Sequence, residues 1–95
     1  MRKITELAIS HFLEGVYFKQ SNTEVIPNFK GISLYLHGNE IASKSPEGVI
    51  KVTTAGWPTN TTKERLNGIP GVKVITVKGQ LYLNGEEWDG GWAIC

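Results

Sequence analysis

The chain has 95 residues, of which 40% are hydrophobic and 20% charged. These proportions are typical of a globular protein, and the length suits a single domain over residues 1–95. No apolar run approaches the roughly 20 residues that span a bilayer, and Glu6 and Glu14 interrupt any signal-peptide core. We therefore expect a cytoplasmic protein with no membrane contact.

The formal net charge is only +1, which argues against the chain-wide positive excess of many nucleic-acid-binding proteins. The charges are unevenly distributed, because all ten Lys and Arg residues precede position 80 while the tail carries Glu86, Glu87 and Asp89. This asymmetry indicates either a charge-complementary binding face or two solvated faces of one domain, and we favour the second explanation. The single cysteine, Cys95, cannot form an internal disulfide.

An amphipathic helix is predicted at the start of the chain. Gly15 follows it as a C-cap. Its apolar residues recur at helical spacing, and they are Ile4, Leu7, Ala8, Phe12 and Leu13. This stripe should cover a sheet.

Strands are predicted to follow the first helix. Val16–Lys19 and Thr23–Ile26 are rich in β-forming residues, with a turn at Ser21-Asn22 between them. A meander of three strands comes next: Gly31–Leu36, Glu40–Lys44 and Val49–Thr53.

A short second helix is predicted to start at Asn60 or Thr61, whose side chains can accept a hydrogen bond from a free backbone N–H. Glu64, three residues after Thr61, completes a capping box, and Gly68 ends the helix. Because so short a helix is only marginally stable in isolation, apolar residues must anchor it to the sheet, and the candidates are Leu66, Ile69 and Trp57.

The last third of the chain predicts further strands. Val72–Val77 is mostly apolar, which favours a central position in the sheet, and Lys78-Gly79 turns it into Gln80–Leu83. The less regular end supplies a final edge strand. Altogether we expect an α+β fold in the order α-β-β-β-β-α-β-β, with an antiparallel sheet of five to six strands, an N-terminal amphipathic helix and a short second helix.

One segment of the chain is nearly repeated. The octapeptide Leu34–Ile41 (LYLHGNEI) returns as Leu81–Trp88 (LYLNGEEW). Both copies read as two strands joined by a glycine turn. Duplication and convergence on good hairpin chemistry both explain the match, and we favour convergence.

Catalysis and metal binding find little support in the residues. The chain has two histidines, one cysteine and one aspartate, and no pair has the spacing of a catalytic or zinc-binding motif. No phosphate-binding glycine motif occurs either. We therefore expect a protein that is not an enzyme and that has no cofactor and no metal site.

The start of the second helix is the first candidate binding site. Hydroxyl, amide and basic side chains surround the free N–H groups there: Thr59, Asn60, Thr61, Thr62, Lys63 and Arg65. Helix N-termini attract phosphate, so a nucleic acid could bind at this point, with Lys51 contributing a further charge. Ordinary helix caps and solvent-facing cations explain the same residues, and we favour that explanation.

The three tryptophans are the second candidate. Tryptophan dominates interface hot spots and stacks on bases, and Trp88 and Trp92 lie in the acidic tail with Glu86, Glu87 and Asp89. Alternatively, Trp57 seats the second helix while Trp88 and Trp92 close the core. We expect Trp57 in the core and Trp92 partly exposed.

Three groups of segments form a recognisable pattern: Leu34–Ala42, Ala55–Trp57 with Thr59–Asn67, and Tyr82–Gly85 with Trp88. With this pattern, the chain resembles a family of small, uncharacterised bacteriophage-encoded proteins from about residue 12 onward. The resemblance implies a phage accessory protein in the host cytoplasm that blocks or redirects a bacterial protein.

The expected function is therefore non-catalytic binding that inhibits or redirects a host or defence protein, through the helix start and the acidic tail. The first alternative is nucleic-acid binding through the region Thr59–Arg65, with affinity that falls steeply with salt. The second is a nucleotide-binding sponge or small enzyme, which requires a pocket. Exposed edge strands are also compatible with a homodimer.

Overall fold

The computed structural model describes residues 2–95, which form two helices and nine strands. In chain order these are α1 (Lys3–Glu14), β1 (Phe18–Gln20), β2 (Thr23–Asn28), β3 (Gly31–Leu36), β4 (Asn39–Lys44), β5 (Ile50–Val52), α2 (Asn60–Asn67), β6 (Val74–Val77), β7 (Gln80–Leu83), β8 (Glu86–Glu87) and β9 (Ala93–Ile94). The α+β class and the antiparallel pairing are confirmed.

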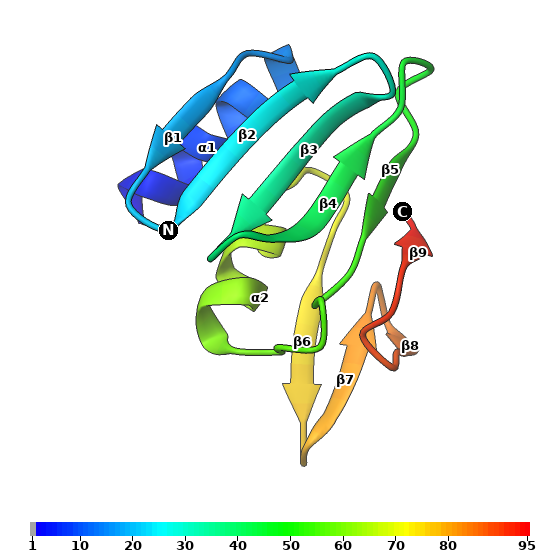
Figure 1. Ribbon diagram of the computed structural model, residues 1–95. Coiled ribbons are helices and arrows are strands. Elements are labelled where there is room, and N and C mark those ends of the chain that lie inside the picture. Colours follow the sequence, from blue (N-terminus) through cyan, green and yellow to red (C-terminus); the bar gives the residue numbers. More distant parts are fainter. Residues whose placement is uncertain (1) are drawn as a thin grey trace.

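The strands form two sheets. One has six strands in the order β1-β2-β3-β4-β5-β9, and the other has three in the order β6-β7-β8. Both helices lie behind the six-stranded sheet in Figure 1, and the β6–β7 hairpin projects below it. Five strands separate the helices, in agreement with the five predicted segments, so the predicted order α-β-β-β-β-α-β-β is one strand short.

The position of β6 corrects a prediction. The apolar run Val72–Val77 was expected in the centre of a sheet, yet β6 is an edge strand of the smaller sheet. Only Val74 of this strand is buried, whereas Ile75 and Val77 are 42% and 47% exposed. Successive side chains of a strand point to opposite faces, so Val74 lies on the buried face, while Ile75 and Val77 share the face that no other layer within residues 2–95 covers.

Both copies of the repeated octapeptide form the predicted hairpins. Their turn residues have positive φ, at 52° and 79° for His37 and Gly38 and at 51° and 88° for Asn84 and Gly85. This geometry matches the tight turns that suit the twist of paired strands. The two hairpins lie in different sheets.

Helix α1 ends as predicted at Gly15, which has a φ of 75°. Its buried stripe differs slightly from the prediction and consists of Thr5, Ala8, Ile9 and Phe12. Ile4, Leu7 and Leu13 lie at the half-buried margins of this stripe.

Helix α2 begins at Asn60, but its cap is Thr59, whose hydroxyl accepts the backbone N–H of Thr62 at 3.2 Å. The predicted capping box from Thr61 to Glu64 is therefore wrong. At the other end, the Asn67 amide accepts the N–H and donates to the carbonyl of Val74, at 2.6 and 2.9 Å. The helix is thereby joined to the edge of β6.

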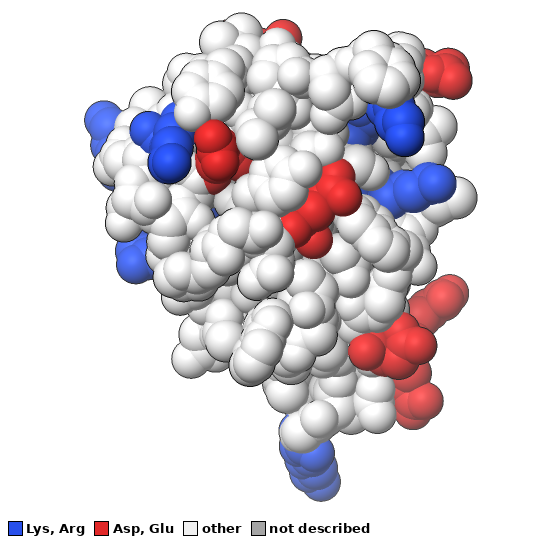
Figure 2. Space-filling view, in the orientation of Figure 1, with Lys and Arg blue, Asp and Glu red and all other residues white. Residues whose placement is uncertain are grey.

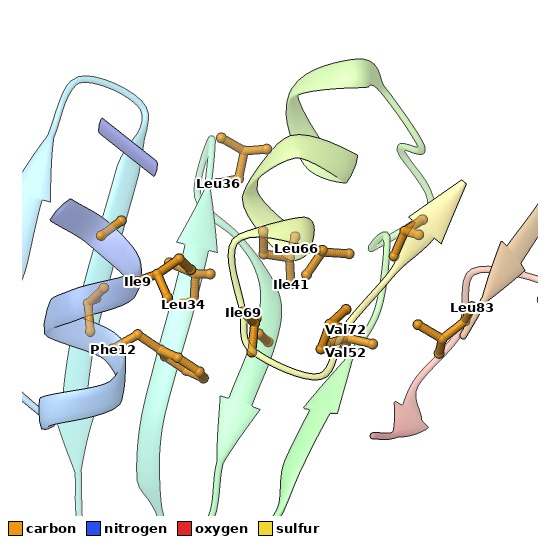
Figure 3. Packing of buried hydrophobic residues seen from close by; sticks show 14 of the residues in the cluster. Ile9, Phe12, Leu34, Leu36, Ile41, Val52, Leu66, Ile69, Val72 and Leu83 are labelled. Atoms are coloured by element: carbon orange, nitrogen blue, oxygen red, sulfur yellow. The ribbon is translucent and has the colours of Figure 1, made fainter. Parts of the chain in front are cut away.

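The core lies between the six-stranded sheet and the two helices. Figure 3 shows side chains of α1, α2, β3, β4 and β5 meeting there, with Leu83 of β7 at one end. Leu66 and Ile69 anchor α2 as predicted. Trp57 does not, because its side chain is 65% exposed.

Candidate binding surfaces

A tight turn presents Trp57 to solvent. Ala55 and Gly56 both have positive φ, at 55° and 83°. The Trp57 N–H donates to the Thr54 carbonyl at 2.9 Å, and the Trp57 carbonyl accepts the Thr59 N–H at 2.8 Å. The backbone of Trp57 is thus held on both sides, which corrects the expected core position and explains the exposure of its indole.

Trp57 forms part of a pocket of about 320 Å³, which we call the Trp57 pocket. The pocket lies between the β3–β4 hairpin and the start of α2. Its lining is Leu36, His37, Asn39, Ile41, Thr54, Trp57, Thr59, Thr61 and Thr62. Its volume falls at the lower end of the range for ligand sites, about 300–1,000 Å³.

The basic residues of the helix start do not share one surface. Arg65 was expected to face solvent but is only 1% exposed, and it lies between α1, α2 and β2. Its Nε donates to the Thr23 hydroxyl at 3.0 Å and its Nη1 to the Thr5 hydroxyl at 2.6 Å and to Glu64. Arg65 is therefore not available to a phosphate.

Glu64 links the two helices. Its carboxylate accepts the Thr5 hydroxyl at 2.6 Å and both the backbone N–H and the Nε of Arg2 at 3.2 Å. It therefore satisfies the first turn of α1 instead of its own helix. Burial alone would raise the pKa of Glu64, but these hydrogen bonds and the Arg2 charge outweigh it and lower the pKa to about 2.

Lys63 and Asn60 occupy different positions. The Lys63 ammonium donates to the Thr76 hydroxyl of β6 at 2.9 Å. Asn60 lies with Thr61, Arg2 and Glu64 around a separate shallow hollow. Of the basic residues named for nucleic-acid binding, Lys51 is exposed and Lys63 partly so.

The acidic tail forms a separate surface over β8. Glu86, Glu87 and Asp89 are exposed, and none of them takes part in an ion pair within residues 2–95. Figure 2 shows their red atoms gathered at the lower right, over β8, with no blue atoms among them. We call these three residues the acidic surface.

The tail tryptophans have different environments. Trp88 is 8% exposed, and its Nε1 donates to the Gly91 carbonyl at 2.8 Å. Trp92 is 51% exposed, in agreement with the prediction. The Gly90 carbonyl accepts the Thr54 N–H at 2.8 Å, which fixes the tail to the loop that carries Trp57. The acidic surface and the Trp57 pocket nevertheless have no lining residue in common.

Sequence reasoning found four of the pocket residues, Trp57, Thr59, Thr61 and Thr62. It missed those that come from β3, β4 and the loop after β5, which are Leu36, His37, Asn39, Ile41 and Thr54. The sequence signal for this side of the pocket was the position of His37 at the tip of the repeated hairpin.

No helix within residues 2–95 is both long and apolar enough to cross a bilayer. Over the same residues, no cluster of three side chains suitable for metal ligation occurs.

Residues 1–93 match the family model of the Kyanoviridae Gp96 protein. The chain belongs to the Kyanoviridae Gp96 protein family. The resemblance to bacteriophage proteins is thereby confirmed, and the Gp96 match also includes α1. No curated protein and no solved structure matches significantly.

Proposed function

We propose that this member of the Gp96 family is a phage accessory protein that binds a bacterial host or defence protein without catalysis and thereby inhibits or redirects it. The acidic surface is the observation that carries the proposal. Three exposed carboxylates without a cationic partner favour a protein with a basic surface.

Apolar side chains beside the acidic surface support this proposal. Strand register aligns Ile75, Tyr82 and Glu87 across β6, β7 and β8 on one face of the small sheet. Ile75 and the next outward residue, Val77, are both substantially exposed. An exposed apolar row bordered by acidic groups suits an interface in which the apolar part supplies affinity and the charges supply orientation.

The test is affinity capture from a nuclease-treated bacterial lysate, followed by mass spectrometry. The tagged wild-type protein is compared with Glu86→Gln/Glu87→Gln/Asp89→Asn, in which the amide oxygen introduced at position 89 can still accept the Gly91 N–H. We expect a discrete protein with the wild type and its loss with this variant.

The matched control removes the same number of charges elsewhere, as Glu6→Gln/Glu14→Gln/Glu47→Gln, at three exposed positions. It should capture the same protein as the wild type. Equal capture by both triple variants would contradict the proposal. Recovery of nucleic acid before nuclease treatment, with all proteins lost afterwards, would instead support the nucleic-acid alternative through Lys51 and Lys63.

A further inference from the structure

We infer that the Trp57 pocket binds a small ligand through an uncharged, planar heteroaromatic ring of the nucleobase type. This site is distinct from the acidic surface and does not depend on the proposed protein partner. The inference follows from the charge, the shape and the free polar groups of the pocket.

The lack of charged residues in the lining restricts which part of a ligand can enter the Trp57 pocket. None of the lining residues is Lys, Arg, Asp or Glu. The charged residues of α2 are bound elsewhere, because Lys63 donates to the Thr76 hydroxyl while Glu64 and Arg65 bond to each other and to Thr5. Because desolvating an unpaired charge is costly, the pocket favours an uncharged group.

Shape favours a flat group. Leu36 and Ile41 are 3% and 1% exposed and supply an apolar floor, while the exposed indole of Trp57 stands at the rim. An indole face stacks on any planar ring. The hydrogen-bonded turn that holds the Trp57 backbone positions this ring in advance of binding, which reduces the ordering cost.

Free polar groups distinguish a heteroaromatic ring from a hydrocarbon ring. Thr59 and Thr62 bond to each other, and Thr54 bonds to Gly90. Among residues 2–95, in contrast, no hydrogen bond from the protein reaches the Asn39 amide or the Thr61 hydroxyl, and both groups line the pocket. An amide and a hydroxyl each donate and accept, so they match the mixed edge of a nucleobase, whereas a phenyl ring would leave them unpaired.

The experiment is a titration of the isotope-labelled protein with adenosine, guanosine, cytidine and uridine, followed by amide and indole chemical shifts. We expect saturable shifts of the Trp57 indole, the Asn39 side-chain amide and the Thr61 backbone with at least one nucleoside. The indole of Trp92 should not move.

Variants assign the contacts. Trp57→Ala should weaken binding by about tenfold or more, the usual effect of losing a stacking partner. Trp92→Ala, the matched control at the other exposed tryptophan, should bind like the wild type. Asn39→Leu and Thr61→Val should change the preference among the four nucleosides. Unchanged unfolding midpoints will show that each variant is folded.

Three results would overturn the inference. The first is no saturable shift with any nucleoside. The second is binding that Trp57→Ala does not weaken. The third is binding of p-cresol, a tyrosine side-chain analogue, without binding of nucleosides, which would assign the pocket to an aromatic side chain of a protein. None of these results bears on protein capture by the acidic surface.

Discussion

Arg65 is the least expected residue of the molecule, because buried arginine is rare unless its charge is paired and hydrogen-bonded. Thr5, Thr23 and Glu64 provide this pairing from three different elements. The network therefore joins α1, α2 and β2.

Replacing Arg65 should destabilise the protein strongly. Arg65→Met removes one hydrogen-bond donor from each of two buried threonine hydroxyls and from the Glu64 carboxylate, and we expect a loss of about 3 kcal/mol in the free energy of unfolding. Chemical denaturation will measure it. The control Lys63→Met, on the same helix, removes only one exposed hydrogen bond to Thr76 and should cost less than about 1 kcal/mol. Equal costs would show that the network contributes little.

Glu64 predicts a loss of stability in acid. Its pKa is about 2 in the folded protein against an ordinary value of 4.5. The unfolded chain therefore binds the proton more readily, so the stabilising contribution of Glu64 is complete above pH 4.5 and disappears as the pH falls through about 2.

The measurement is the free energy of unfolding at several pH values for the wild type and Glu64→Gln. The difference between the two should shrink steadily as the pH is lowered. A difference that does not change with pH would mean that the charge of this carboxylate is unimportant. Comparison with the variant removes the contributions of the other acidic residues.

At the scale of elements, the two helices approach closely at Gly68. A Cβ atom there would lie 2.8 Å from Thr5 Cγ2 and 2.9 Å from Ile9 Cγ1. The φ of Gly68 is −75°, so contact and not backbone conformation requires glycine at this position.

Gly68→Ala should therefore push α1 away from α2. We expect a loss of about 2 kcal/mol, which is typical of overpacking, measured as a lower denaturation midpoint. Thr61→Ala, in the first turn of the same helix, should stay within about 0.5 kcal/mol of the wild type. If Gly68→Ala were equally neutral, the helix contact would be looser than the structure indicates.

Elements defined by local chemistry were predictable from the sequence. Glycine turns at Gly38 and Gly85 and the helix end at Gly15 follow from neighbouring residues alone. Partners that are distant in sequence were not predictable. Arg65 bonds to residues that lie 42 and 60 positions away in the sequence. The periodicity of hydrophobic residues within one helix or strand carries no information about such distant contacts.

The candidate site was predictable only in part, for the same reason. Its helical side is continuous in sequence, whereas Asn39 and Ile41 arrive from a hairpin in the larger sheet. Trp57 was misassigned because hydrophobicity favours burial, while a turn with positive φ at Ala55 holds the ring outside.

At the scale of the whole molecule, the acidic surface predicts an interaction that depends on salt. The dissociation constant for the captured protein should rise as ionic strength increases, because salt screens exposed charges beyond about 10 Å at 0.1 M. Calorimetry at low and high salt will test this. The variant Glu86→Gln/Glu87→Gln/Asp89→Asn should show a much smaller salt dependence, and an equal dependence would place the electrostatic contacts elsewhere on the protein.

The contact between Asn67 and Val74 also affects how copies of the chain behave at high concentration. Residues 72–77 are rich in β-branched side chains and carry one charge, at Lys73, a composition typical of segments that aggregate. Asn67 occupies the backbone groups of Val74 that a second chain would otherwise pair with. Asn67→Ala should therefore form fibrils sooner than Asn60→Ala at the other end of α2, as followed by light scattering. We therefore expect Asn67, the last residue of α2, to oppose self-assembly through the edge of β6.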